Sequence, residues 1–235
     1  MRNESRRNLL RSLVIAPVAG ALASSAAAQS GAVYGGFTVA PPQSKYLNRP
    51  TPEMLLKMGS HAREQLRVKH FPDVVLTNQD GQQFRYYTDL LKDKVVALNF
   101  FYTKCEGICP GVTANLTKVY KILGDRMGKQ IFMYSITLKP EQDTPEVLKE
   151  YARTFNAGPG WMFLTGNYDN IEQVRRGMGF VNSDPVLDKD KSQHIGNICY
   201  GNESHMLWGI GPGLVNATWL AHEISSVVGP DVKRS

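Results

Sequence analysis

The sequence predicts an α/β fold, in which strands and helices alternate along the chain around one sheet. Three observations predict it. The continuous apolar run at residues 95–102 is typical of a strand buried on both faces, as in a parallel sheet. Helical patterns follow this run and the later apolar runs. The 235 residues, 42% of them hydrophobic and 20% charged, suffice for a sizeable core and exclude a mostly disordered chain.

The expected elements follow in chain order. Thr51 is a favoured N-cap and Pro52 fits a first helical position, so a short helix should start there. An Asp-Gly pair at residues 80–81 predicts the turn of a hairpin over residues 74–86. After the strand at 95–102, apolar residues at helical spacing predict a helix from Pro110 to Gly124. The same criteria predict strands at 131–136, 161–164 and 194–200, and helices at 143–155, 171–179 and 216–228. The charged residues 184–191 and the Gly-rich residues 209–213 are expected to be loops.

Residues 1–28 have the order of a cleavable signal peptide: a basic stretch, an apolar stretch, and small residues ending at Ala28. Arg6 and Arg7 resemble a twin-arginine export signal, and a general secretory signal with two arginines is the alternative. We expect a linker and the short helix at 29–65, and the folded domain at 66–230. The expected compartment is the bacterial periplasm, with membrane attachment only through a partner or an uncleaved signal.

The net charge argues against a nucleic-acid partner. Loss of residues 1–28 would remove four Arg and one Glu and lower the formal net charge from +6 to +3. The remaining sequence has no block of Lys and Arg with interleaved aromatic residues, which is the usual footprint of nucleic-acid binding. We therefore look for the function in the chemistry of individual side chains.

Cys105 and Cys109 supply that chemistry, on what we expect to be an exposed loop between the strand at 95–102 and the next helix. Pro110 suits a first helical position, so Cys109 should lie near a helix N-terminus, where the helix dipole favours a thiolate. Two thiols on one loop can bind a soft metal, of which Cu(I) fits best, or can alternate between dithiol and disulfide. The remaining alternative is that the two cysteines are purely structural, either as a disulfide or as two inert buried thiols.

The flanking residues resemble the Sco/SenC family of thioredoxin-like copper proteins. The C-x-x-x-C-P motif follows Phe-Phe-Tyr, and the resemblance continues through Asp-Thr-Pro-Glu at 143–146 and Gly-Trp-Met-Phe-Leu-Thr-Gly at 160–166. It covers roughly residues 70–228. It implies a thioredoxin-like fold with a central mixed β-sheet flanked by helices, an N-terminal hairpin and an N-terminal extension. It also implies a copper site formed by the two motif cysteines, here Cys105 and Cys109, and a later histidine.

His194 is the expected third copper ligand, because it lies in the region where the resemblance places a histidine, with His205 as second choice. Imidazole suits copper in either oxidation state, Cu(I) or Cu(II). His61, His70 and His222 lie outside that region. If 194–200 is a strand, Cys199 faces away from His194 and is expected to be a small buried hydrophobic residue.

The sequence departs from the resemblance in two places near the expected site. Relatives often carry Asp in a Ser-x-Asp-Pro pattern after the second buried strand, whereas residues 135–140 read Ser-Ile-Thr-Leu-Lys-Pro. The residues after His194 also differ from the usual His-Ser pattern.

The expected function is an exported metallochaperone, rather than an enzyme, that delivers copper to an acceptor. By resemblance the acceptor is the Cu-A centre of cytochrome c oxidase. A thiol–disulfide oxidoreductase that reduces partner cysteines before metallation, and itself needs a thiol reductant protein, is the alternative. A thiol peroxidase ranks third, because no Arg adjoins the motif.

Overall fold

The computed structural model describes residues 33–34, 37–38, 52–190 and 196–229. The chain forms two compact units, residues 1–51 and 52–235. In the first unit, the described residues form an antiparallel pair, β1 (Val33–Tyr34) and β2 (Phe37–Thr38). The expected signal peptide at residues 1–28 lies outside the described residues. All features below belong to the second unit.

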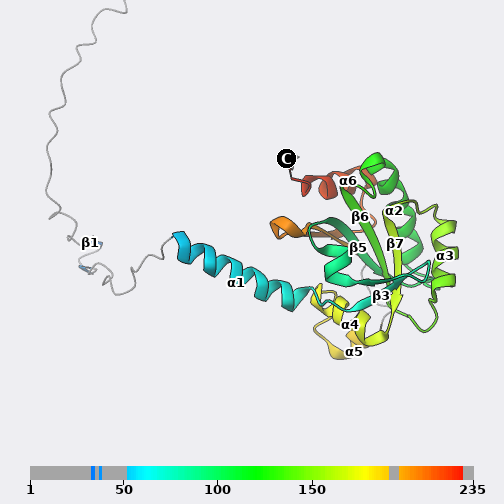
Figure 1. Cartoon of the computed structure of the whole chain (residues 1–235), viewed down its shortest axis with the longest axis horizontal. Helices are drawn as coiled ribbons and strands as arrows, with labels where there is room; N and C mark the ends of the chain where they lie inside the picture. The colour runs from blue at the N-terminus through cyan, green and yellow to red at the C-terminus, as the bar shows by residue number, and fades with distance from the viewer. Residues whose placement is uncertain (1–32, 35–36, 39–51, 191–195, 230–235) are drawn as a thin grey trace, which may run out of the picture. The chain divides into compact units, whose positions relative to one another are not determined.

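A seven-stranded sheet organises the second unit, in the order β4-β3-β7-β6-β5-β8-β9 (Figure 1). The three central strands β7, β6 and β5 are parallel, and the other pairings are antiparallel, so the expected mixed sheet is confirmed. All seven residues of β5 are buried, as the continuous apolar run predicts. The strands are β3 (Val75–Asn78), β4 (Gln83–Arg85), β5 (Val95–Phe101), β6 (Ile131–Thr137), β7 (Trp161–Gly166), β8 (Asn197–Asn202) and β9 (Leu207–Pro212).

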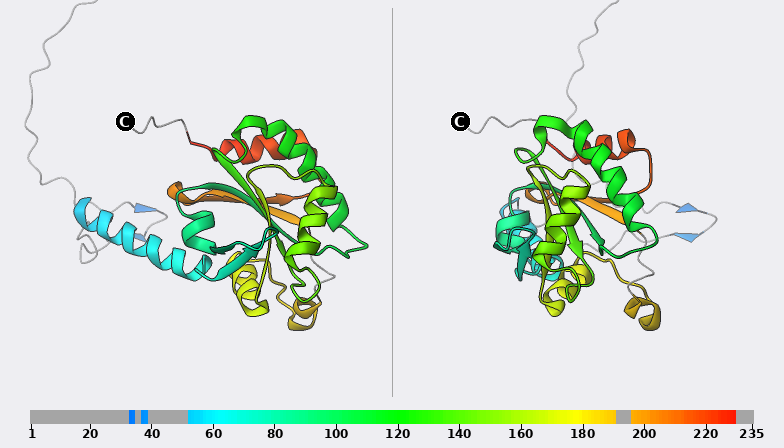
Figure 2. Two further views of the ribbon diagram at one scale, coloured as in Figure 1. Left: turned by 45° about the vertical axis from the view of Figure 1, so that its right-hand side comes forward. Right: turned by 90° about the vertical axis from the view of Figure 1, so that its right-hand side faces the viewer.

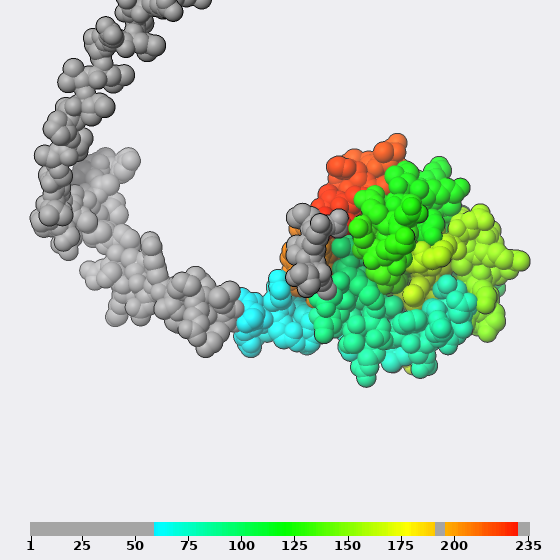
Figure 3. Space-filling model, turned by 45° about the horizontal axis from the view of Figure 1, so that its top comes forward, coloured from blue at the N-terminus to red at the C-terminus, as the bar shows by residue number. Residues whose placement is uncertain are grey.

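Helices cover both faces of this sheet. Residues of α2, α3 and α6 pack with one face, and residues of η2 and α4 pack with the other. The views in Figures 2 and 3 show α2 (green) beside α6 (orange to red). Among the described residues, no helix combines the length and apolar character needed to cross a membrane. The helices are α1 (Pro52–His70), η2 (Tyr86–Leu91), α2 (Cys109–Leu123), η3 (Gly124–Arg126), α3 (Pro145–Thr154), α4 (Tyr168–Gly177), α5 (Pro185–Lys189), η5 (Glu203–His205) and α6 (Ala217–Ser226).

The structure adds η2 and the β1–β2 pair, which the sequence does not predict, and it differs from the expected elements at α1, α5 and β9. The N-terminal helix is not short, because α1 continues for 19 residues. Residues 185–189, which read as loop, form α5. The glycine-rich residues 207–212 form the edge strand β9, where a side chain at Gly209 would lie 2.8 Å from the Tyr200 ring. Glycine is used here because a neighbouring strand's aromatic ring covers the backbone, so its presence does not indicate a loop.

The register of β5 brings two distant segments to the same edge of the sheet. β6 runs parallel to β5, so the loops after both strands leave at one end. β8 runs antiparallel, with Asn99 opposite Ile198, so the segment before β8 arrives at that same end. The cysteine loop and the start of β8 therefore lie at the same end of the sheet.

A buried ion-pair network anchors the segment that leads to this edge. Arg175 on α4 binds both carboxylate oxygens of Asp188 on α5, at 2.7 and 2.8 Å, and also binds Glu172 at 2.7 Å. Arg176 and the backbone N–H of Asn182 add further hydrogen bonds to Asp188. The Arg175 and Asp188 side chains are only 5% and 6% exposed. The network therefore fixes residues 182–188 to α4.

We expect Asp188→Asn to lower the free energy of unfolding at pH 7 by about 3 kcal/mol, because it leaves a buried Arg charge undercompensated. The hydrogen bond from Arg175 holds the pKa of Asp188 far below its usual value, against the effect of burial. The stabilisation is therefore present above the pKa of about 3.9 of an unfolded Asp and is lost as the pH falls below it. Urea unfolding at several pH values measures the difference between variant and wild type, which should shrink below pH 4.

Glu150→Gln is the control, because it breaks the exposed Glu150–Arg153 pair, with an expected change within about 0.5 kcal/mol. Equal effects of the two variants at pH 7 would contradict a stabilising role for the buried network.

Candidate metal centre

Cys105 and Cys109 lie at the edge of the sheet where β5 ends and α2 begins. Both are free thiols, 8% and 2% exposed, so the expectation of an exposed loop is wrong for the sulfur-bearing side chains. They belong to the same buried cluster as Tyr102, Val112 and Leu220. The Cys105 N–H donates to the Tyr102 carbonyl at 3.3 Å, which turns the chain from strand into loop.

The hydrogen bonds around the two sulfurs converge on Cys105. Burial raises its pKa, but donors outweigh that effect: the Cys109 N–H, the Cys109 thiol, the Gly107 N–H and the Tyr102 hydroxyl. The pKa of Cys105 is therefore lowered. Burial, followed by the hydrogen bond with Cys105, raises the pKa of Cys109 to about 12. The thiolate is therefore favoured at Cys105 and not, as the sequence predicts, at Cys109. The reason is that the Cys109 N–H, at the start of α2, donates to the Cys105 sulfur.

Asp143 holds the chain on either side of this loop. Its fully buried carboxylate accepts hydrogen bonds from the Thr103 N–H (3.1 Å), the Thr103 hydroxyl (2.5 Å) and the Thr137 hydroxyl (2.5 Å). Thr103 lies two residues before Cys105, and Thr137 ends β6. The sequence marks Asp143 only as the first residue of the Asp-Thr-Pro-Glu motif. Its role in holding the loop does not show there, because that role depends on contacts between distant residues.

His194 lies outside the described residues, but both flanks of its segment are described. A side chain at Gly196 would lie within 3.2 Å of Ile108 and Val112, so its backbone packs on the cysteine loop and α2. On the other side, Asp190 interacts electrostatically with Tyr102. The described residues on either side, Asp190 and Gly196, thus both lie on the side of the sheet end that carries the cysteine loop.

The second-choice ligand His205 lies at the wrong end of the sheet. Val95, at the start of β5, pairs with Asn202, and His205 follows that pair. Seven residues of strand separate this end from the cysteine loop, or roughly 20 Å. His61 and His222 are exposed on α1 and α6, and His70 Nδ1 contacts the Gly177 carbonyl at 2.8 Å.

Cys199 is buried on the opposite face of the sheet from the cysteine pair, as expected for a small hydrophobic residue. It pairs with Leu98, whose neighbours on β5 face the other core. It also lines a hollow of about 300 Å³ with Met178 and Met206. Burial raises the pKa of Cys199 to about 12.

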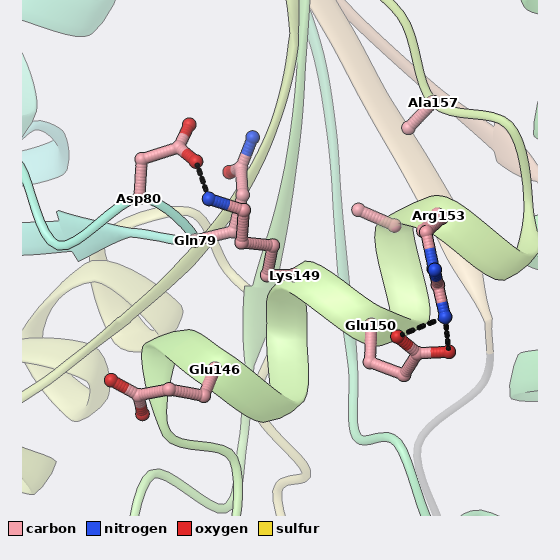
Figure 4. Close-up of a pocket in the computed structure, with 8 residues that line it drawn as sticks. Gln79, Asp80, Glu146, Lys149, Glu150, Arg153 and Ala157 are labelled. Atoms are coloured by element: carbon pink, nitrogen blue, oxygen red, sulfur yellow. Dashed lines mark hydrogen bonds and ion pairs between the residues drawn. The ribbon is translucent and has the colours of Figure 1, made fainter.

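A larger hollow, of about 540 Å³, lies between α3 and the hairpin turn (Figure 4). Four of its five charged side chains form ion pairs, with Lys149 Nζ 3.0 Å from Asp80 and Arg153 2.8 Å from Glu150. Within the described part of the chain, no three His, Cys, Asp or Glu side chains are grouped to hold a metal ion. The end of the sheet that carries Cys105 and Cys109 is therefore the candidate centre.

Asp143→Ala should lower the free energy of unfolding by about 3 kcal/mol, because it leaves the buried Thr137 hydroxyl and the part-buried N–H and hydroxyl of Thr103 without their acceptor. Chemical denaturation measures the change. Asp125→Ala, at an exposed position on η3, is the control and should change it by less than about 0.5 kcal/mol. A loss in Asp143→Ala no greater than in the control would show that the carboxylate does not hold the loop.

Cys199 should resist iodoacetamide in the native protein at pH 8. A pKa of about 12 leaves roughly one thiol in ten thousand ionised, whereas an ordinary cysteine is roughly a quarter ionised. Mass spectrometry of native and urea-unfolded samples should show Cys199 modified only after unfolding. Rapid modification in the native protein would contradict its burial.

Comparison with known proteins agrees with this architecture. The family model SCO1/SenC matches residues 61–228. A putative copper-binding protein of Stutzerimonas stutzeri is 29% identical over 134 residues, which cover 56% of this chain and 64% of that protein. A SCO2-like protein of Rickettsia prowazekii (strain Madrid E) is 36% identical over 99 residues, 42% of this chain and 46% of that protein. The matches thus span about half to two thirds of these relatives.

Solved structures show the same fold. Bradyrhizobium japonicum ScoI with copper bound has a TM-score of 0.55 and 22% identity, covering 67% of this chain and 98% of that one. Yeast Sco1 with copper bound has a TM-score of 0.54 and 21% identity, covering 67% and 91%. BsSco, described as having a disulfide switch and as a member of the Sco family of cytochrome c oxidase assembly proteins, has a TM-score of 0.56 and 24% identity, covering 68% and 94%. These likenesses confirm the expected thioredoxin-like α/β fold, and because the family model covers more than half of its length, the chain belongs to the SCO1/SenC family.

Proposed function

We propose that this protein binds one copper ion through Cys105, Cys109 and His194 and delivers it to a copper enzyme outside the cytoplasm. One observation carries the proposal. Two free thiols are hydrogen-bonded to each other at the end of the sheet near which Asp190 and Gly196, the described residues that flank 191–195, also lie. Relatives named for copper binding, and Sco structures with copper bound, support the choice of metal.

The donor set fits copper. The Cys105 and Cys109 sulfurs are close enough to share a hydrogen bond, so both can reach one ion. Thiolate sulfur selects Cu(I), and imidazole binds copper in both oxidation states. Asp143 and the hydrogen bonds of Thr103 hold the loop, so the two sulfurs are placed before the ion arrives.

We infer that copper leaves by ligand exchange with the acceptor, which can approach the two buried sulfurs over the exposed residues Lys104, Glu106 and Gly107 of the cysteine loop. The Cu-A centre of cytochrome c oxidase is the proposed acceptor, and the description of BsSco as a cytochrome c oxidase assembly protein supports it. The signal-like residues 1–28 support export to the periplasm.

Thiol–disulfide exchange is the second candidate function. The observation that favours it is the asymmetric pair, with the pKa of Cys105 lowered and that of Cys109 raised, which is typical of an attacking and a resolving cysteine. The disulfide switch named for BsSco also supports it. This function uses the same two cysteines and does not need His194.

We expect the purified, reduced protein to bind one copper per chain. Cys105→Ser, Cys109→Ser and His194→Ala should each weaken the copper affinity by ~10–100-fold or more. Loss of a residue that only hydrogen-bonds to a metal ligand has an effect of that size, and each of these variants removes a ligand itself. Competition with a Cu(I) chelator measures the affinities.

Cys199→Ser and His205→Ala are matched controls, since they remove the same donor types away from the site, and both should keep wild-type affinity. Undiminished binding in His194→Ala would refute its role as a ligand. No stable copper in the reduced wild type would refute the copper proposal and leave the oxidoreductase in first place.

A further inference from the structure

Tyr102 contacts both cysteines. It follows β5 directly and is 6% exposed. Its hydroxyl hydrogen-bonds with the Cys105 sulfur, and its backbone N–H hydrogen-bonds with the Cys109 sulfur. The same residue therefore sets the position of both sulfurs, and its hydroxyl is a donor that a phenylalanine would lack.

A lysine lies on the ring of this tyrosine. Lys139 Nζ is 4.2 Å from the centroid of the Tyr102 ring. The Lys139 N–H donates to the Thr137 hydroxyl at 3.0 Å, and that hydroxyl donates to Asp143 at 2.5 Å, so the backbone below the lysine is held in place. A cation over an aromatic face is attracted by the ring, and it withdraws electron density from a phenol. The lysine therefore makes the Tyr102 hydroxyl a stronger donor toward Cys105.

We propose that Tyr102 and Lys139 are positioning residues that tune the Cys105 sulfur and favour its reduced states. The hydroxyl bond to sulfur is made in the dithiol and is weakened in the Cys105–Cys109 disulfide, because a disulfide sulfur is a poor acceptor. The bond therefore stabilises the dithiol. Hydrogen bonds to a ligating cysteine sulfur also tune the potential of a copper site, and here the bond favours Cu(I). This second effect rests on the proposed copper function, whereas the first does not.

The metal-free protein gives the direct test. Cys105 and Cys109 lose two protons and two electrons as their S–S bond forms, and glutathione disulfide takes up both to give two glutathione thiols. The reduced full chain is equilibrated with glutathione buffers at pH 7.0, quenched with acid, and the Cys105–Cys109 disulfide is counted by mass spectrometry. Tyr102→Phe should shift the equilibrium constant about tenfold toward the disulfide, which is about 30 mV for a two-electron couple.

Lys139→Met should shift the equilibrium constant about threefold in the same direction, and should add nothing in the Tyr102→Phe background, because the lysine acts through the hydroxyl. Lys104→Met is the matched control, since it removes an exposed lysine from the cysteine loop and should leave the constant unchanged. If Lys104→Met shifts the constant as much as Lys139→Met, the effect is one of general charge and the proposal fails.

A wild-type constant in folded Tyr102→Phe would overturn the proposal. If that variant does not fold, as judged by circular dichroism, Lys139→Met decides, and a wild-type constant there overturns it. In the copper-loaded protein, Tyr102→Phe should keep one copper per chain but oxidise from Cu(I) to Cu(II) at a lower potential. Failure of the wild type to bind copper would refute the proposed function and leave the glutathione result standing.

Discussion

The buried carboxylate of Asp143 fixes the directions in which the chain leaves the two central strands of the sheet. It binds Thr103 after β5 and Thr137 at the end of β6, and so ties both loops to the start of α3. Tyr102 precedes one of these threonines, and Lys139 follows the other by two residues. The meeting of the tyrosine ring with the ammonium group, and the placement of the Cys105 sulfur, both depend on this one buried acceptor.

The parts of the fold that follow from local pattern were predictable. The apolar run at residues 95–102 and the helical spacing after Pro110 predicted β5 and α2, and therefore the strand-to-helix position of the cysteines. The burial of Cys199 followed in the same way, because alternation along a strand decides which face a side chain takes. In each case the information lies within a few residues of sequence.

Features that depend on contacts between distant segments were missed. Nothing near Gly209 in the sequence shows that the ring of Tyr200 covers it, so β9 read as a loop. The sequence predicted a lowered pKa for Cys109, whereas the structure lowers the pKa of Cys105. Closeness to a helix N-terminus along the chain does not show which sulfur accepts hydrogen bonds from the N–H groups there. The role of Asp143 could not be predicted for the same reason, since its donors come from two distant places, the turn after β5 and the end of β6.

The antiparallel placement of β8 beside β5 has a consequence for how the protein is made. The packing of Gly196 against Ile108 joins segments far apart in the chain, and such contacts form only after the loop between them has closed. Before β8 has joined the sheet, the cysteine loop lacks the packing of Gly196 against Ile108. Its thiols are then open to thiophilic ions and oxidants, so the pair is most vulnerable before the last long-range contacts of the sheet have formed.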